Sequence, residues 1–160
     1  MRPTLRLRMA LVGALLVLAA MPALSRAASD AYTGDLATPH TTPNGVTSGI
    51  QFNVILKKND KGKRVPTFVR RFESRVVPMY CEDGSISYQV GFFPHPTLEV
   101  PIRRRKFEDS VNNEGDRYEI AGQIPKSGPA TGTIRLFSAA FGDFPNCDSG
   151  VVSWTATTSG

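Results

Sequence analysis

The stretch Cys147-Asp148-Ser149-Gly150-Val151-Val152-Ser153-Trp154-Thr155-Ala156 contains the second of two cysteines, the only tryptophan and the last predicted strand. The first cysteine, Cys81, lies far upstream. Two cysteines in an exported chain predict one disulfide bond, with a single connectivity available. Closing a loop of roughly 65 residues contributes about 4 kcal/mol to stability when the cross-link is treated as a restriction of the unfolded chain. This stretch therefore predicts how the fold is closed.

Residues 1–27 have the organisation of a secretory signal peptide. Arg2, Arg6 and Arg8 precede an uncharged apolar run from Met9 to Leu24, and Ser25-Arg26-Ala27 places small residues at a cleavage site. The alternative is an uncleaved membrane anchor, but the run is shorter than the roughly 20 residues needed to span a bilayer. We therefore predict cleavage near Ala27, only transient contact with the membrane, and a secreted, cell-envelope or periplasmic protein.

Removal of the signal peptide changes the charge balance. The full chain has 19 Lys and Arg against 14 Asp and Glu. Four of the arginines belong to residues 1–27, which contain no acidic residue, so 15 basic residues remain against 14 acidic ones. The basic pI near 9.5 is thus largely a property of the targeting segment. The sequence predicts no nucleic-acid partner.

The mature chain has the pattern of an all-β domain. It is rich in Gly, Pro, Thr and Ser and lacks a long apolar run of helical period. Alternating apolar residues predict five strands, over residues 50–57, 86–92, 118–124, 130–136 and 152–156. Residues 64–81 predict one long strand or two short ones, with a bulge near Glu73 to Arg75. Turn sequences separate these segments.

These elements predict an antiparallel β-sandwich, or a partly open barrel, of six to eight strands over residues 50–160, with Trp154 in its core. Residues 28–49 are interpreted as a polar lead-in, part of it flexible. A mixed α+β domain is the alternative fold. An immunoglobulin domain is disfavoured, because its core tryptophan lies between the two cysteines, whereas Trp154 follows both.

Several short motifs occur together in an order that carries a resemblance: Tyr32-Thr33-Gly34, Cys81-Glu82-Asp83-Gly84, Tyr118-Glu119-Ile120-Ala121-Gly122, Ala130-Thr131-Gly132-Thr133-Ile134-Arg135, Cys147-Asp148-Ser149-Gly150 and Trp154-Thr155-Ala156. Over residues 31–157 the chain resembles a recurrent small secreted bacterial domain, an exported all-β protein with one disulfide bond and uncharacterised function. The resemblance implies fold and compartment and supplies no catalytic or binding residue. This chain departs from the pattern in its longer, basic loops at residues 57–64 and 103–106.

Few residues predict catalysis or metal binding. His40 and His95 are the only histidines, and the cysteines are expected to bind each other, so the sequence predicts neither a metal site nor a cofactor. There is no Gly-x-Ser-x-Gly motif, and carboxylates adjacent on a strand point to opposite faces. We therefore predict that the protein is not an enzyme. The alternative is a secreted hydrolase that uses His95.

Two loop regions are the candidate binding sites. The aromatic residues Phe92 and Phe93, and also Phe141 and Phe144, lie in loops where an exposed ring would suit carbohydrate or protein contact. The run Arg103, Arg104, Arg105 and Lys106 suits an acidic envelope polymer, or else protects an edge strand from pairing. The sequence thus predicts a monomeric extracellular binding module for a cell-envelope protein or glycan, with a basic-loop binder of anionic polymers as the alternative.

Overall fold

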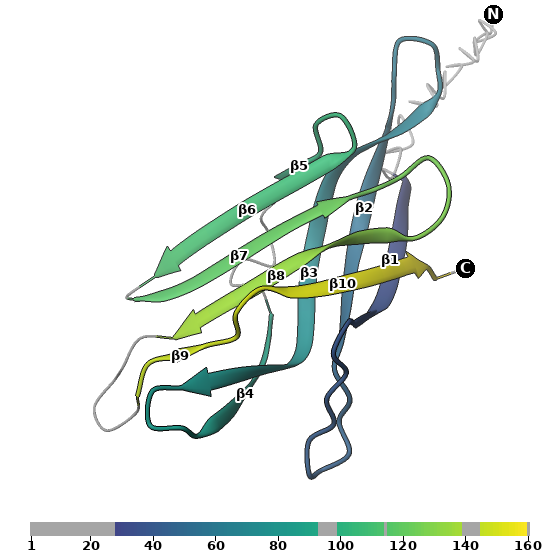
Figure 1. Ribbon diagram of the computed structural model, residues 1–160. Coiled ribbons are helices and arrows are strands. Elements are labelled where there is room, and N and C mark those ends of the chain that lie inside the picture. Colours follow the sequence, from purple (N-terminus) through teal and green to yellow (C-terminus); the bar gives the residue numbers. More distant parts are fainter. Residues whose placement is uncertain (1–27, 93–98, 114, 139–144, 160) are drawn as a thin grey trace, which may run out of the picture.

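The computed structural model describes residues 28–92, 99–113, 115–138 and 145–159 (Figure 1). These residues contain ten antiparallel strands: β1 (Ala28–Leu36), β2 (Gly49–Lys58), β3 (Arg64–Cys81), β4 (Ile86–Phe92), β5 (Val100–Pro101), β6 (Lys106–Asn113), β7 (Asp116–Gln123), β8 (Ala130–Ser138), β9 (Cys147–Asp148) and β10 (Val152–Thr158). The described part of the chain contains no helix, and so none that could cross a membrane. The predicted signal peptide lies outside the described residues.

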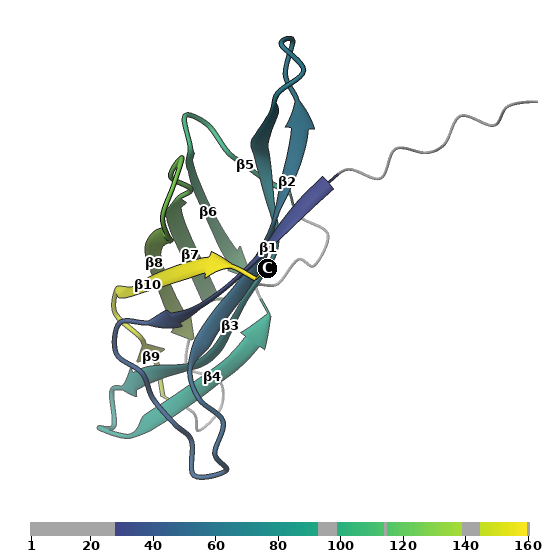
Figure 2. The same cartoon turned by 90° about the vertical axis from the view of Figure 1, so that its right-hand side faces the viewer.

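Six of the strands form a closed barrel. Neighbours follow the order β10-β1-β2-β3-β9-β8, and pairing of β8 with β10 completes the circle. β7 and β6 extend the sheet from β8, while β4 and β5 pair with β3 (Figures 1 and 2). The expected antiparallel all-β fold is therefore confirmed, and closure of the barrel leaves few strand edges free.

One strand lies where we expected a polar lead-in. β1 pairs with β10 on one side and with β2 on the other, so residues 28–36 are an integral part of the barrel. Its largely polar sequence suits this position, since only Tyr32 and Leu36 are buried and its outward face meets solvent. Partner strands provide the stability that its own composition does not. β1, together with the two-residue strands β5 and β9, accounts for the strands beyond the expected number.

β3 is the longest strand and it bends. Its register with β4 shifts between Ser74 and Val77, close to the bulge expected at Glu73 to Arg75. Its register with β2 shifts between Gln51 and Asn53 and again between Ile55 and Leu56. Both Arg71 and Val76 have positive φ angles. These irregularities shift the inward-facing positions from even-numbered to odd-numbered residues. Phe72, Val77 and Met79 are therefore all buried.

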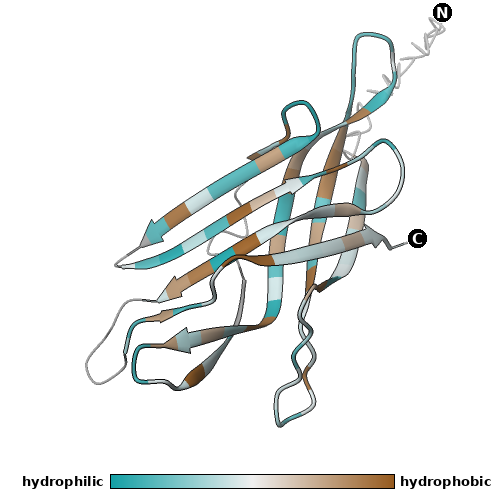
Figure 3. Cartoon of the chain, viewed as in Figure 1, coloured by the Kyte–Doolittle hydropathy of each residue, from teal (hydrophilic) through white to brown (hydrophobic). Residues whose placement is uncertain are grey.

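The core is centred on Trp154, which is only 2% exposed. Its ring lies 5.6 Å from Phe52, 5.8 Å from Phe72 and 6.2 Å from Phe107, measured between centroids. Its Nε1 finds no hydrogen-bond acceptor among the described residues, so packing rather than hydrogen bonding holds the indole. Figure 3 shows the apolar residues as brown bands that alternate with polar ones along the strands.

Two glycines make room for this ring. A Cβ atom on Gly132 would lie 2.3 Å from the indole Cζ2 atom, and one on Gly122 would lie 2.7 Å from it. Both glycines face the interior from adjacent positions, because Gly122 pairs with Gly132 across β7 and β8. The close approach of the indole to the sheet therefore requires glycine at both positions.

The predicted disulfide bond is confirmed. Cys81 and Cys147 are bonded, with a sequence separation of 66, and they are directly paired residues of β3 and β9. The bond joins the end of the longest strand to the segment that leads into β10. The cross-link therefore lies where the barrel closes.

Candidate functional site

The basic run forms a tight turn between β5 and β6. The backbone N–H of Arg103 donates to the carbonyl of Lys106 at 2.8 Å, and the N–H of Lys106 donates to the carbonyl of Arg103 at 2.9 Å. Arg104 and Arg105 occupy the two central positions with φ values of 49° and 69°. Turns of this geometry favour Asn or Gly, because the left-handed region costs other residues roughly 1–2 kcal/mol each. Two arginines are therefore held in a conformation that local sequence preference disfavours.

Arg105 stabilises the turn. Its Nη1 donates to the carbonyl of Ile124 at 2.9 Å, and the Ile124 N–H donates to the Arg105 carbonyl at 2.8 Å. The guanidinium also lies near Tyr32, whose pKa is raised chiefly by burial and partly by Asp30, while Arg105 opposes that rise. The side chain of Arg105 is half-buried. It is therefore a structural member of the run.

The other three basic side chains project into solvent. Arg103, Arg104 and Lys106 are exposed, and none forms an ion pair with a carboxylate of the described residues. This distinguishes them from Arg70, Arg117 and Arg135, which pair with Glu99, Glu119 and Asp148 respectively. The turn thus presents three cations that form no ion pair within the described residues.

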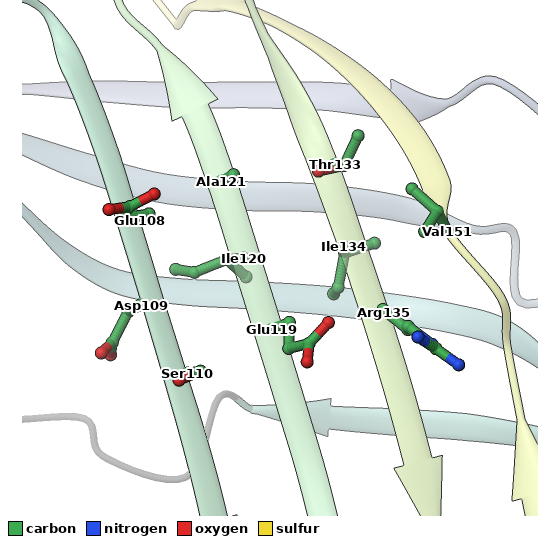
Figure 4. A pocket seen from close by; sticks show the side chains of 10 residues that line it. All are labelled: Glu108, Asp109, Ser110, Glu119, Ile120, Ala121, Thr133, Ile134, Arg135 and Val151. Atoms are coloured by element: carbon green, nitrogen blue, oxygen red, sulfur yellow. The ribbon is translucent and has the colours of Figure 1, made fainter.

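A groove begins beside this turn and runs across the outer face of β6, β7 and β8. A hollow of about 430 Å³ is lined by Arg103 and Lys106 at one end and reaches Glu108 and Ala121. These last two residues also line a second hollow, of about 480 Å³, that continues over β7 and β8 (Figure 4). We call the two together the outer groove. Its outward side chains are Arg103, Lys106, Glu108, Ser110, Glu119, Ala121, Thr133 and Arg135.

Strand register explains why these side chains gather. Glu108 pairs with Ala121, which pairs with Thr133. Two residues away on each strand, Ser110 pairs with Glu119, which pairs with Arg135. Residues that are directly paired across antiparallel strands share a face, so polar side chains from three strands form adjacent rows. Val151, which is 69% exposed, borders the far end.

Ion pairs orient the charged side chains at that far end. The Nε and Nη2 atoms of Arg135 donate to the two carboxylate oxygens of Asp148 at 3.1 Å and 2.5 Å. These hydrogen bonds are the main reason that the pKa of Asp148 lies below its ordinary value. Arg117 pairs with Glu119 at 3.2 Å. The charged side chains Glu119 and Arg135 at the far end of the groove are thus ion-paired, whereas Arg103, Arg104 and Lys106 are not paired within the described residues.

The aromatic candidates cannot be placed against this groove. Phe93, Phe141 and Phe144 lie outside the described residues, as does His95. Phe92 is the last residue of β4, and its side chain is not described. The binding role predicted for these loops therefore stays a prediction. Among the described residues, no group of three His, Cys, Asp or Glu side chains could hold a metal ion.

Sequence reasoning missed the outer groove. It identified the basic run but considered carboxylates only as neighbours along one strand, whereas the groove joins Glu108 to residues of β7 and β8. The polar positions that alternate along residues 106–112, 117–123 and 131–137 were the available signal. Combining them required the pairing of the three strands.

No family model, curated protein or solved structure matches this chain. The resemblance to a secreted bacterial domain with one disulfide bond therefore stays a prediction.

Proposed function

We propose that the protein is an exported, non-catalytic binding module whose outer groove holds an acidic glycan of the cell envelope. The observation that carries this proposal is the location of Arg103, Arg104 and Lys106, exposed and unpaired within the described residues, beside the open end of the groove. Cations that lack internal partners can bind carboxylate or phosphate groups without first breaking an ion pair.

The rest of the groove suits a polar chain. Hydroxyl and carboxylate side chains of Ser110, Thr133 and Glu108 line a hollow that is open to solvent (Figure 4). Sugar hydroxyls form hydrogen bonds with such groups, while the basic end would select chains that carry negative charge. His95, on which the hydrolase alternative depends, lies outside the described residues.

Binding of the mature chain to acidic and neutral polysaccharides, measured by isothermal titration calorimetry, tests the proposal. We expect binding to the acidic polymer only, with affinity that falls steeply as salt rises, because exposed charges are screened. Replacing Arg104 and Lys106 together with Gln should weaken binding by at least about tenfold, which is about 1.4 kcal/mol.

The matched control removes two exposed lysines from the turn between β2 and β3, as Lys61→Gln and Lys63→Gln, which leaves the same net charge. If both double variants lose affinity equally, the attraction is non-specific and the groove has no special role. Release of shorter saccharides during the titration would contradict the non-catalytic part of the proposal.

A further inference from the structure

The free edge of β4 is long and uncharged, which distinguishes it from the other free strand edges of the described residues. β4 pairs with β3 on one side, and no described strand pairs with its other side. Its sequence, ISYQVGF, contains no charged residue. Two other described strands pair on one side only: β5 is just two residues long, and β6 contains Lys106, Glu108 and Asp109. Exposed strand edges are normally protected by charge, and β4 lacks that protection.

The outer face of the β3–β4 hairpin is apolar as well as exposed. Tyr80 is 56% exposed, Ile86 54% and Tyr88 38%, and Tyr80 is paired directly with Ile86. The opposite face of the hairpin carries Val77 and Met79, which are buried in the core. Apolar residues therefore occupy both faces of this hairpin. On the outer face Pro78 is buried and the Tyr88 ring lies 6.3 Å from that of His40, measured between centroids, while Tyr80 and Ile86 are the most exposed.

Hydrogen bonding at the turn shows which backbone groups of β4 are available. The Cys81 N–H donates to the Ser85 carbonyl at 3.0 Å, so the pair Cys81–Ser85 is hydrogen-bonded. Hydrogen-bonded and non-hydrogen-bonded pairs alternate along an antiparallel ladder. Met79–Ser87 and Val77–Gln89 are then the next bonded pairs. The backbone groups of Ile86 and Tyr88 consequently point toward the free edge.

From these observations, we propose that two copies of this chain associate through β4, edge to edge and antiparallel, about a twofold axis at Tyr88. In this arrangement Tyr88 exchanges two backbone hydrogen bonds with Tyr88 of the second copy, and the apolar faces of the two hairpins form one surface. An isologous contact brings each residue near the axis against itself. A charged residue at the axis would therefore repel its own copy, whereas uncharged β4 can pair with itself.

This contact is compatible with the outer groove and goes beyond the proposed function. Figures 1 and 2 show β4 at the end of the molecule opposite the turn between β2 and β3, and β6 belongs to the other extension of the sheet. A dimer would therefore present two grooves at once, which raises the apparent affinity for a polymer. The proposal departs from the monomer expected from the sequence.

Sedimentation velocity of the mature chain measures the association. Concentrations should reach about 1 mM, because a single strand edge gives a small and weak interface. We expect a monomer–dimer equilibrium. Amide hydrogen exchange should show concentration-dependent protection at Ile86 and Tyr88. A wild-type protein that stays monomeric over this range would overturn the proposal.

Charge variants at the axis identify the partner as a second copy. Tyr88→Lys and Tyr88→Glu should each raise the dimer dissociation constant by at least about tenfold, because like charges meet at the axis. An equimolar mixture of the two variants should recover the dimer, now as a heterodimer. A mixture that stays monomeric would contradict the twofold arrangement.

Control variants separate this effect from misfolding. Ile86→Lys, at a more exposed position, should also weaken the dimer, and Asn112→Lys on β6 should leave it intact. Near-ultraviolet circular dichroism of Trp154 checks that each variant is folded. If Asn112→Lys weakens association as much as Tyr88→Lys does, the contact is not at β4 and the proposal is wrong. The proposal is also wrong if the amides of β4 gain protection from hydrogen exchange only when an envelope extract is added, because the partner is then another molecule.

Discussion

The inner and outer faces of β7 and β8 belong to the same strands but differ in what limits their side chains. On the inner face, Gly122 and Gly132 leave space that the indole of Trp154 fills. On the outer face, neighbouring positions carry Glu119, Thr133 and Arg135, which line an open groove. The inner face leaves almost no freedom in side-chain size, whereas the outer face leaves charge and hydrogen bonding free to vary.

This difference shows how one sheet can serve stability and binding without conflict. Side-chain period in a strand is two, so a change at one position affects one face and leaves the next residue in place. The inner face explains why the barrel holds together around a tryptophan. The outer face has no comparable packing constraint, which is why we place the binding function there.

Replacing Trp154 tests the inner face with the largest expected effect. Trp154→Ala should lower the free energy of unfolding by about 3–5 kcal/mol, because it leaves a cavity among three phenylalanine rings. Thr155→Ala, at the next residue on the exposed face of β10, should change it by less than about 0.5 kcal/mol. Urea denaturation measures both. Comparable losses would show that the two faces do not differ in the way described.

Removing the disulfide bond should have a similar but slightly smaller effect, through a different route. The double variant Cys81→Ser and Cys147→Ser should lose about 2–5 kcal/mol, mainly because the unfolded chain gains freedom. Where the variant is still folded, the near-ultraviolet signal of Trp154 should match that of the oxidised protein. A changed signal would mean that the cross-link also shapes the inner face.

A change in the basic turn should raise stability while it lowers binding. Arg104→Gly removes a non-glycine residue from φ = 49°, so we expect a gain of about 1 kcal/mol in the free energy of unfolding. Arg103→Gly, where φ is not positive, should instead lose stability. Thermal denaturation and glycan titration of both variants measure the two effects. Should Arg104→Gly be destabilising, the turn would owe its geometry to contacts of the Arg104 side chain.

The ion pair at the far end of the groove should contribute least. The pKa of Asp148 is lowered in the folded state, so its contribution is present above the unfolded pKa and is lost as pH falls through the folded value. Asp148→Asn should therefore cost less than about 1 kcal/mol at neutral pH, since both side chains are partly exposed. The difference between variant and wild type should vanish in acid. Denaturant titrations from pH 7 to about pH 2 would reveal a constant difference if the effect were not electrostatic.

The sequence predicted those strands in which apolar and polar residues alternate. β2, β7, β8 and β10 place an apolar residue at every second position, and the two cysteines allowed one pairing. β1 was missed because its polar residues form a strand only through pairing with β2 and β10. The turn at Arg104 and Arg105 has no Asn or Gly to indicate its geometry, and its conformation depends on contacts with Ile124.

The candidate site was predictable only in part for a related reason. The basic run is contiguous in sequence, so its charge could be recognised directly. The groove depends on which residues of β6, β7 and β8 are opposite one another, and register is a property of the assembled sheet. The apolar surface of the β3–β4 hairpin was equally hidden, because alternation in β4 does not reveal that Ile86 and Tyr88 face solvent.

The pairing of β1 with β10 brings the first and last strands of the barrel side by side. Ser159 donates its backbone N–H to the Ala31 carbonyl at 2.8 Å, close to the start of β1. A short linker could therefore join the two ends, and new ends could be opened at the surface turn of residues 59–63. Such a circular permutant would keep every strand neighbour while β1 and β10 became a covalent hairpin, which makes it a direct route to studying the order in which this barrel assembles.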